Sequence, residues 1–483
     1  MASVSPSTFV GKAIKFGTDG WRGVIAADFT FDRVGKVAAL AAQVLEETYG
    51  SNGSKTVIVG YDRRFLSGDF ARYAAESIAA AGYEVKLSEC FAPTPAFSWA
   101  AFDQKALGAI VITASHNPAM YNGLKIKSAL GGSVPPEVTE KVEAKLDQTV
   151  PKAEKPGSIT AFDPWPSYCN ALRSMVDIEA IRQAVDEGKL TVFAEVMHGA
   201  AATGIGRLLD REINEINSEA DPLFEGGAPE PLPKYIPKLF KAIENKKNNG
   251  VTVGLIFDGD SDRIAGMDGQ ANFLSSQVLI PILMEHLTKR RGMTGEVVKT
   301  LSGSNLFVEL AKRYDLPLYE TPIGYKYIAD RMQDAAVLIG GEESGGIGYG
   351  HHIPERDALL SALYLLEAVV QSEKDFGELN ESLRAQCDFT AVYDRIDLPL
   401  ASMDVRAKLL EALQTDRPNE VAGERVDNCI TVDGYKFNLE DNSWLLIRFS
   451  GTEPVLRLYS EAASMERVHE ILNWAKEWAQ SVE

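Results

Sequence analysis

A run of small polar residues, Thr113-Ala114-Ser115-His116-Asn117-Pro118, stands directly after the apolar segment 107–112. The apolar segment predicts a buried strand, and open α/β sheets place their active sites just beyond the carboxyl ends of strands. Pro118 prevents a regular continuation. Ser115 is therefore expected on a tight, exposed turn, where a hydroxyl can take and return a chemical group. Ordinary turn chemistry also explains Ser, Asn and Pro in this place, so the motif does not establish a function alone.

An acidic loop follows a second apolar segment. In Asp-Gly-Asp-Ser-Asp-Arg the carboxylates alternate at Asp258, Asp260 and Asp262. Oxygen ligands in a compact loop suit a hard cation, Mg²⁺ or Ca²⁺, and carboxylates this close repel one another unless a cation neutralises them. An EF-hand is excluded, because Arg263 and Gly269 occupy the positions that require Gly and Glu. The loop predicts a metal site, and Arg263 could hold a phosphate oxygen.

Two further loops contain groups that could hold an anion or a sugar. Gly-Gly-Glu-Glu-Ser-Gly-Gly at 340–346 follows an apolar segment, but a glycine-rich strand end is usually only a turn. In Arg-Phe-Ser-Gly-Thr-Glu-Pro at 448–454, a glycine between two hydroxyls lets backbone N–H groups converge on an anion. Arg448 could add a bidentate contact to phosphate. This loop lacks the G-x-x-x-x-G-K pattern of a Walker A loop.

The composition limits the classes of function. The chain has 483 residues, 45% of them hydrophobic, and a formal net charge of −19. This length predicts three or four domains, and the acidic balance argues against nucleic-acid binding. The four cysteines are scattered and form no zinc pattern with the six histidines. The start of the chain does not resemble a secretory signal, and the apolar segment 358–370 is too short to span a membrane. We therefore expect a cytoplasmic protein with no membrane association.

Apolar segments of strand and helix type alternate along most of the chain, which is typical of successive α/β units. Strands are expected at 55–61, 83–87, 107–112, 191–196, 251–257, 296–301 and 336–339, and helices at 69–82 and 276–291. After about residue 388 an Asp433-Gly434 hairpin signal, strands at 444–449 and 456–460 and a helix capped by Ser464 indicate a smaller α+β domain.

Together and in this order, T-A-S-H-N-P, D-G-D-S-D-R, G-E-E-S-G and R-x-S-G-T-E-P resemble the motifs of the α-D-phosphohexomutase family. The resemblance runs over essentially the whole chain and includes F-G-T-D-G-W-R-G at 16–23 and G-Y-D-R-R at 60–64. G-E-E-S resembles the phosphoglucomutase form of the sugar loop. Phosphomannomutases more often carry G-E-M-S-G-H and phosphoglucosamine mutases G-E-Q-S-G-H, and Gly346 stands where those have His.

The resemblance implies a fold. It is an α/β protein of three successive α/β domains with mixed sheets, plus a smaller C-terminal α+β domain, arranged around a central cleft. We expect four domains: 1–155 with the phosphoserine loop, 156–273 with the metal loop, 274–387 with the sugar loop, and 388–483, the phosphate-binding domain. A hinge near 386–400 would let the last domain open.

The resemblance also implies a reaction. Ser115 would be the phosphorylated residue, with Asp258, Asp260 and Asp262 holding Mg²⁺ against a phosphoryl oxygen. A hexose 1-phosphate would take the phosphoryl group on O6 to give a 1,6-bisphosphate, which turns over in the cleft and returns a phosphate from O1 to Ser115. Such chemistry needs mainly positioning and charge neutralisation. The implied activator is glucose 1,6-bisphosphate, the only implied partner is a small phosphosugar, and the protein would be a monomer or homodimer.

Individual roles follow from the matched positions. His116 would orient the reacting phosphate, and Arg22, Lys125 and Lys326 would contact the reacting sugar. A free Lys is a poor base, but burial among cations can lower its pKa; Lys127, by contrast, is expected to be a solvated surface cation. Glu342 and Ser344 would bind the O3 and O4 hydroxyls. The full set of expected substrate-binding residues is Arg263, Gly324, Glu342, Ser344, Arg448, Ser450, Gly451 and Thr452.

The function predicted from the sequence is therefore phosphoglucomutase, the reversible conversion of glucose 1-phosphate and glucose 6-phosphate. A phosphomannomutase or dual-specificity mutase, or a glucose-1,6-bisphosphate synthase, is the alternative within the family. A serine hydrolase using Ser115 and His116 is disfavoured, because there is no G-x-S-x-G elbow and neighbouring side chains on an extended turn point to opposite sides. A non-catalytic phosphosugar-binding protein would be expected to lack Ser115 or a metal Asp, and none is missing.

Overall fold

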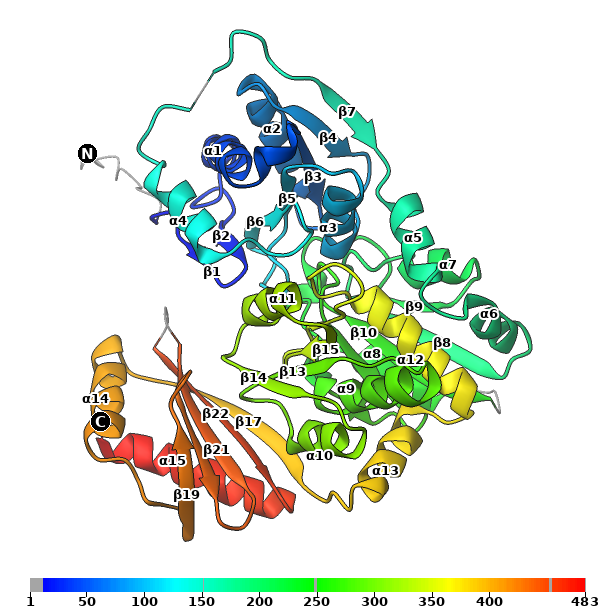
Figure 1. The fold of residues 1–483 in the computed structure, drawn as a ribbon, viewed down its shortest axis with the longest axis vertical. Helices are drawn as coiled ribbons and strands as arrows, with labels where there is room; N and C mark the ends of the chain where they lie inside the picture. Colours follow the sequence, from blue (N-terminus) through cyan, green and yellow to red (C-terminus); the bar gives the residue numbers. More distant parts are fainter. Residues whose placement is uncertain (1–11, 151, 247–249, 451–453, 483) are drawn as a thin grey trace, which may run out of the picture.

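The computed structural model describes residues 12–150, 152–246, 250–450 and 454–482. Within these ranges the strands form four sheets that follow one another along the chain (Figure 1). We refer to the units built on them as domains I to IV. No helix in the described ranges is long and apolar enough to cross a membrane.

Domain I is a mixed sheet in the order β1-β2-β6-β5-β3-β4-β7, with helices on both faces. Its apolar strands are buried on both sides: Val57 and Val59 of β3 pack under helices α1 and α2, whereas Ile58 faces α3. The pairs from β5 through β3 and β4 to β7 are parallel, and β1, β2 and β6 extend the sheet antiparallel. The elements are β1 (Phe16–Gly17), β2 (Gly20–Val24), α1 (Phe31–Tyr49), β3 (Thr56–Tyr61), α2 (Ser67–Ala80), β4 (Glu84–Ser88), α3 (Thr94–Asp103), β5 (Gly108–Ile112), β6 (Tyr121–Ser128), α4 (Pro136–Ala144) and β7 (Ile159–Phe162).

Domain II has a sheet in the order β12-β11-β10-β8-β9, in which β10, β8 and β9 are parallel. The tight β10–β11 connection contains the acidic loop. Its elements are α5 (Trp165–Arg173), α6 (Ile178–Asp186), β8 (Leu190–Glu195), α7 (Gly204–Leu209), β9 (Asn214–Ile216), α8 (Pro237–Glu244), β10 (Val251–Phe257), β11 (Ile264–Met267) and β12 (Phe273–Leu274).

Domain III has a sheet in the order β14-β13-β15-β16, parallel except for β16. The predicted helix 276–291 is present, although its last turn is a π-helix over His286–Arg290. The elements are α9 (Ser276–Glu285), β13 (Glu296–Thr300), α10 (Asn305–Arg313), β14 (Leu318–Thr321), α11 (Tyr325–Asp334), β15 (Val337–Gly341), β16 (Ile347–Gly348), α12 (Ala358–Ser372) and α13 (Phe376–Gln386).

Domain IV is an antiparallel sheet in the order β17-β22-β21-β20-β19-β18, covered by α14 and α15 (Figure 1). The predicted hairpin is confirmed, with Gly434 at φ +84° beside β20, and Ser464 precedes the last helix as expected. The elements are β17 (Val392–Pro399), α14 (Met403–Thr415), β18 (Glu420–Val421), β19 (Glu424–Ile430), β20 (Tyr435–Leu439), β21 (Trp444–Phe449), β22 (Val455–Ala462) and α15 (Met465–Val482).

Apolar clusters within and between the domains hold the molecule together, and domain I has a core of its own under α1 and α2. One continuous cluster runs from α3 of domain I through domain II to α12 and α13 of domain III. Domain IV has a core of its own, and a small cluster of Leu301, Trp444, Leu446 and Tyr459 joins it to domain III. The predicted fold class, three α/β domains followed by an α+β domain around a cleft, is therefore confirmed.

Candidate active site

The loops singled out in the sequence meet in one cleft. The serine loop follows β5, the acidic loop follows β10, the glycine-rich loop follows β15, and the start of the last loop follows β21. Their residues line a cavity of about 760 Å³ together with residues of all four domains. Strand ends and the turns after them thus bring residues far apart in sequence to one place.

Ser115 lies buried directly behind His116 and Asn117, which line this cleft. Its hydroxyl is 2.9 Å from Asp258 Oδ2 and 3.3 Å from His116 Nδ1. The expectation of an exposed turn is wrong, because the residue is only 1% exposed. The argument against a Ser–His contact is also wrong: Ser115 has φ +52°, not an extended conformation, and this left-handed turn brings both side chains to the same side.

Arg64 holds the serine loop and was assigned no role from sequence. Its guanidinium donates to the backbone carbonyls of Ser115 and Asn117, each at 2.6 Å, and to that of Pro118 at 3.1 Å. Asp62 accepts the Arg64 backbone N–H at 3.0 Å. A guanidinium fixed among carbonyls keeps the strained turn in place, and both residues come from the G-Y-D-R-R segment.

The acidic loop forms a compact set of ligands. Single carboxylate oxygens of Asp258, Asp260 and Asp262 all lie within 4.8 Å of one another, and all three residues are buried. Oδ1 of Asp260 and Oδ1 of Asp262 accept no hydrogen bond from the described residues. Burial and the two neighbouring carboxylates raise the pKa of Asp258 well above its usual range. Buried carboxylates at this spacing, with oxygens that accept no hydrogen bond within the described ranges, fit a hard divalent cation such as Mg²⁺.

Lys125 holds the opposite oxygens of these carboxylates. Its ammonium lies 2.7 Å from Asp260 Oδ2, 2.8 Å from Asp262 Oδ2 and 2.7 Å from Asp19 Oδ2. Burial alone would lower the pKa of Lys125, but the three carboxylates outweigh it and raise the pKa above its usual value. Carboxylates rather than cations therefore dominate its surroundings, and the arrangement suits a permanently charged Lys125 rather than a base.

Lys127 is a second correction. It was expected to be a solvated surface cation, but its side chain is fully buried. Its ammonium lies 2.5 Å from Glu355 Oε2 and 3.1 Å from Asp19 Oδ1. The alternation along β6 does not distinguish the two lysines, because Lys125 and Lys127 point to the same face, and each is paired with Asp19.

The cations around Ser115 also set the state of His116. Burial, followed by the charges of Arg263 and Arg22, lowers the pKa of His116 well below its usual value. The imidazole is therefore neutral at neutral pH. Arg22 itself donates to Asn117 Oδ1 at 2.5 Å, next to the serine, and lines the cleft. The predicted neighbours Ser115, His116 and Arg22 are thus brought together.

The glycine-rich loop forms a tight turn against the acidic loop. Glu342 N–H donates to Gly346 O at 2.9 Å, and Ile264 N–H donates to Gly345 O at 3.0 Å. Gly345 has φ +100°, which favours glycine. Glu342, Ser344 and Arg263, which were expected to bind substrate, line the cleft. Burial raises the pKa of the Glu342 carboxyl to about 7.

Domain IV places cations opposite this loop. Arg448, with Arg395 and Arg457, lines the cleft, and Ser450 lies beside them. Asp433 accepts from Arg448 Nε at 3.0 Å and from the backbone N–H of Ile323 in domain III at 3.0 Å. The predicted Gly451 and Thr452 lie outside the described residues. A cluster of guanidiniums on one wall suits a phosphate group.

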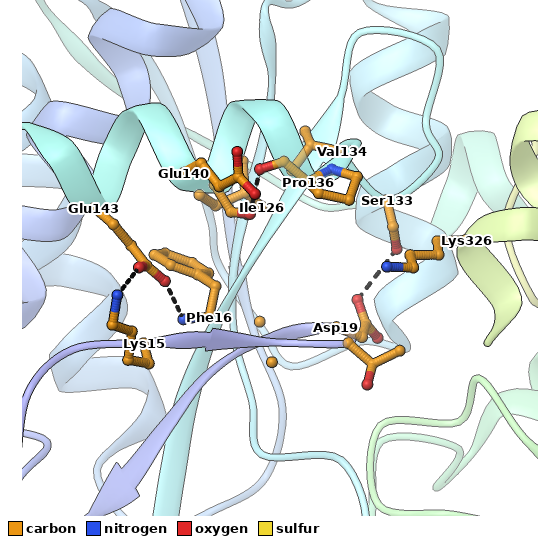
Figure 2. Close-up of a pocket in the computed structure, with 14 residues that line it drawn as sticks. Lys15, Phe16, Asp19, Ile126, Ser133, Val134, Pro136, Glu140, Glu143 and Lys326 are labelled. Carbon is orange, nitrogen blue, oxygen red and sulfur yellow. Dashed lines mark hydrogen bonds and ion pairs between the residues drawn. The ribbon is translucent and has the colours of Figure 1, made fainter. Parts of the chain in front are cut away.

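Lys326, at the start of α11, lines both the main cleft and a second cavity of about 500 Å³, and Gly324 lines the main cleft. Figure 2 shows this second cavity, with Lys15 and Glu143 at one end and Asp19, Ser133 and Lys326 at the other. Glu143 accepts the backbone N–H of Phe16 at 2.7 Å and thereby holds β1 beside both cavities. Sequence reasoning gave Asp19 no role, although it lies within the F-G-T-D-G-W-R-G motif.

A buried serine hydroxyl beside three clustered carboxylates, next to a cleft with arginines in its wall, fits an enzyme that transfers a phosphoryl group with a divalent metal. Comparison with known proteins agrees with this class. The family described as phosphoglucomutase/phosphomannomutase matches in four parts: alpha/beta/alpha domain I at 13–152, domain II at 166–271, domain III at 275–387 and the C-terminal domain at 402–473.

Whole relatives align over nearly the full chain. The chain is 29% identical over 465 residues to a phosphoglucomutase/phosphomannomutase of Thermococcus kodakarensis (95% of this chain, 96% of the relative). It is 29% identical over 479 residues to a phosphoglucosamine mutase of Thermoanaerobacter pseudethanolicus (97% and 98%). The crystal structure of a candidate phosphomannomutase from Thermus thermophilus superposes with a TM-score of 0.83 at 32% identity, covering 98% of this chain and all (100%) of that one.

The chain belongs to the α-D-phosphohexomutase family. It is a phosphohexomutase, an isomerase-class phosphotransferase. The family uses Mg²⁺, and the three loop carboxylates are present to hold it.

Proposed function

We propose that this phosphohexomutase interconverts glucose 1-phosphate and glucose 6-phosphate, with Ser115 carrying the phosphoryl group between turnovers. The observation that supports this most is the 2.9 Å contact between Ser115 Oγ and Asp258 in the carboxylate cluster. A phosphate on this oxygen would face the predicted metal ligands on one side and the cleft on the other.

The residues divide the work of the reaction. Asp258, Asp260 and Asp262 would hold Mg²⁺, which neutralises charge on the transferring phosphoryl group. In the first half-reaction the bond between phosphorus and Ser115 Oγ breaks, a bond between phosphorus and O6 of glucose 1-phosphate forms, and the O6 proton passes to a base. In the second half the bond between phosphorus and O1 of the reoriented bisphosphate breaks and the bond between phosphorus and Ser115 Oγ forms again. O1 takes back the proton held by the base, and glucose 6-phosphate leaves.

The remaining groups position the substrate. Arg22 and neutral His116 would orient the reacting phosphate, and Lys125 supplies a fixed positive charge. Lys326, which lies in the cleft at a position that matches the family's sugar contacts, would bind the sugar. Arg448 and Ser450 would hold the phosphate that is not transferred. Arg263 and Gly324, nearer the reacting end, would hold the sugar.

The preference for glucose rests on the Gly-Glu-Glu-Ser loop. Glu342 and Ser344 would bind O3 and O4, which are oriented alike in glucose and mannose, so this pair alone discriminates weakly at C2. Its second glutamate, Glu343, forms an ion pair of 3.1 Å with Arg395 of domain IV, which ties the loop to the phosphate wall. Several relatives are named phosphoglucosamine mutases, so a glucosamine phosphate is the second candidate substrate.

Purified protein tested side by side on glucose, mannose and glucosamine 1-phosphates decides between these substrates. We expect the highest kcat/KM for glucose 1-phosphate, and a lag that added glucose 1,6-bisphosphate abolishes, because the bisphosphate restores phosphate to Ser115. A higher kcat/KM for the mannose or glucosamine compound would overturn the glucose assignment. Accumulation of bisphosphate as the end product would instead indicate a synthase.

A further inference from the structure

Three consecutive charged residues before α12 reach different parts of the molecule. Glu355 pairs with the buried Lys127 of domain I at 2.5 Å. Asp357 accepts a hydrogen bond from Tyr168 of domain II at 2.7 Å and caps α12 of its own domain. Arg356, between them, reaches into the active site. One short segment therefore joins domains I, II and III where their loops meet.

Arg356 closes a ring of alternating charges around the metal loop. Its Nη2 contacts Asp262 Oδ2 at 2.7 Å and also pairs with Asp19 Oδ2. Lys125 contacts the same two oxygens from another direction. Arg356 is only 4% exposed and lines the cleft with Glu342. Two cations thus hold the outer oxygen of Asp262, while its Oδ1 accepts no hydrogen bond from the described residues.

The stem of Arg356 occupies space that a side chain at position 346 would need. A Cβ added to Gly346 would lie 2.5 Å from Arg356 Cδ and 3.1 Å from Cγ, far inside van der Waals contact. These are atoms of the stem, and the guanidinium beyond them is anchored by two carboxylates, so the side chain cannot simply swing away. Gly346 and Arg356 are therefore mutually dependent.

We propose that Arg356 is a positioning residue of the phosphohexomutase reaction, that it acts through Asp262 and Asp19, and that Gly346 is glycine so that Arg356 can reach them. The proposal rests on the proposed role of Asp262 as a metal ligand. By fixing Oδ2, Arg356 leaves Oδ1 turned toward the other ligand oxygens. By fixing Asp19, it keeps the carboxylate that orients Lys125 in place.

The test compares Arg356→Ala, Arg356→Lys, Gly346→Ala and the double variant Gly346→Ala/Arg356→Ala. We expect Arg356→Ala to lower kcat about 100-fold, since small displacements of catalytic groups have effects of this size, with KM changed only a few-fold. Arg356→Lys should recover part of the loss. Gly346→Ala should lower kcat in the wild type but have no further effect in Arg356→Ala, because the space is then free.

A measurement without turnover separates a positioning role from a merely structural one. Mn²⁺ bound in place of Mg²⁺ should give an EPR line shape in Arg356→Ala that differs from the wild type. Arg331→Met, which removes a domain III arginine paired with Glu296 away from the cleft, is the matched control and should leave kcat and line shape unchanged. Should Arg356→Ala not fold, Arg356→Lys is expected to show an intermediate kcat and an altered line shape.

The outcomes distinguish this proposal from the one on which it rests. If wild-type protein binds no Mn²⁺, the assignment of the metal loop fails first. If wild type binds Mn²⁺ but Arg356→Ala keeps the same line shape or the same kcat, Arg356 does not position Asp262. If the decreases in kcat of Gly346→Ala and Arg356→Ala add up in the double variant, the two residues do not depend on each other.

Discussion

At the scale of single residues, Ser115 and its partner Asp258 are both closed off from solvent. We expect Ser115→Ala to abolish turnover and to remove the covalent phosphate, because no neighbouring hydroxyl replaces Oγ. The protein should still fold, since alanine loses only the hydroxyl contacts to Asp258 and His116 and meets a backbone strain similar to that of serine at φ +52°. Activity assays and intact-protein mass spectrometry check both points, with Ser167→Ala, outside the cleft, as the control. Wild-type activity in Ser115→Ala would contradict a mechanism in which Ser115 carries the phosphoryl group.

Glu342 gives a pH-dependent prediction. Burial raises the pKa of its carboxyl from an ordinary value of 4.5 to about 7 in the folded protein. Between these values the folded state binds a proton that the unfolded chain does not, so this group makes stability fall as pH rises from about 4.5 through 7. Glu342→Gln removes the ionisation and should raise Tm relative to wild type more at pH 8 than at pH 5.

The same position tests the sugar loop. Loss of a carboxylate that orients the sugar should lower kcat/KM about 100-fold in Glu342→Ala. A Tm difference between Glu342→Gln and wild type that does not change between pH 5 and pH 8 would contradict the buried carboxyl. A small effect of Glu342→Ala on kcat/KM would remove this loop from the substrate site.

The residues that sequence reasoning found and those it missed differ in kind. Ser115 and the loop carboxylates stand in short motifs next to apolar strands, so their types and spacing are visible locally. Arg64 and Arg356 act through guanidinium contacts to distant segments, which their own sequence neighbours do not reveal. Lys125 and Lys127 show the same limit. The alternation of side chains along a strand puts both on one face of β6, but only tertiary contacts decide that both are buried with Asp19.

At the scale of elements, the β10–β11 connection gives a prediction on metal. EDTA should abolish activity and added Mg²⁺ should restore it. Without a cation, the three buried carboxylates repel one another and the metal loop loses its arrangement. Asp260→Asn should raise the Mg²⁺ concentration needed for half-maximal activity, since an amide is a weaker ligand for a hard cation. Asp268→Asn is the control, because Asp268 follows β11 in the same domain and lies outside the carboxylate cluster. This variant should leave the Mg²⁺ requirement unchanged. Full activity in chelator, with no metal by elemental analysis, would contradict the assignment.

The strands beside the active-site loops were predictable because each is a short apolar run with loop residues after it. The helix 69–82 and strand 55–61 were found within two residues as α2 and β3. What could not be predicted is pairing between distant segments. β7, at 159–162, joins the first sheet beside β4, so that sheet extends beyond residue 155. β2 pairs with β6 across about a hundred residues, and no local pattern encodes either pairing.

At the scale of the whole molecule, domain IV has a separate core and meets domain III through a small apolar cluster. We propose that it opens about the segment between α13 and β17, within the predicted hinge 386–400, so that the bisphosphate can reorient. Arg448→Ala should then raise KM and let more of the intermediate escape, because the cleft loses a cation on the wall that would hold the phosphate.

Release of labelled glucose 1,6-bisphosphate during turnover measures this escape. Arg425→Ala, an exposed arginine of the same domain, serves as the control. Retention of the intermediate as in wild type, together with an unchanged KM, would show that domain IV is not the phosphate clamp.

The segment from Glu355 to Asp357 has a consequence for building hybrids between members of the family. Its side chains are matched to Lys127 and Asp19 of domain I and to Asp262 and Tyr168 of domain II. A graft of residues 275–387 from a distant homologue would bring foreign side chains to these buried charges and leave some of them unpaired. The first three domains should therefore be exchanged together rather than one at a time.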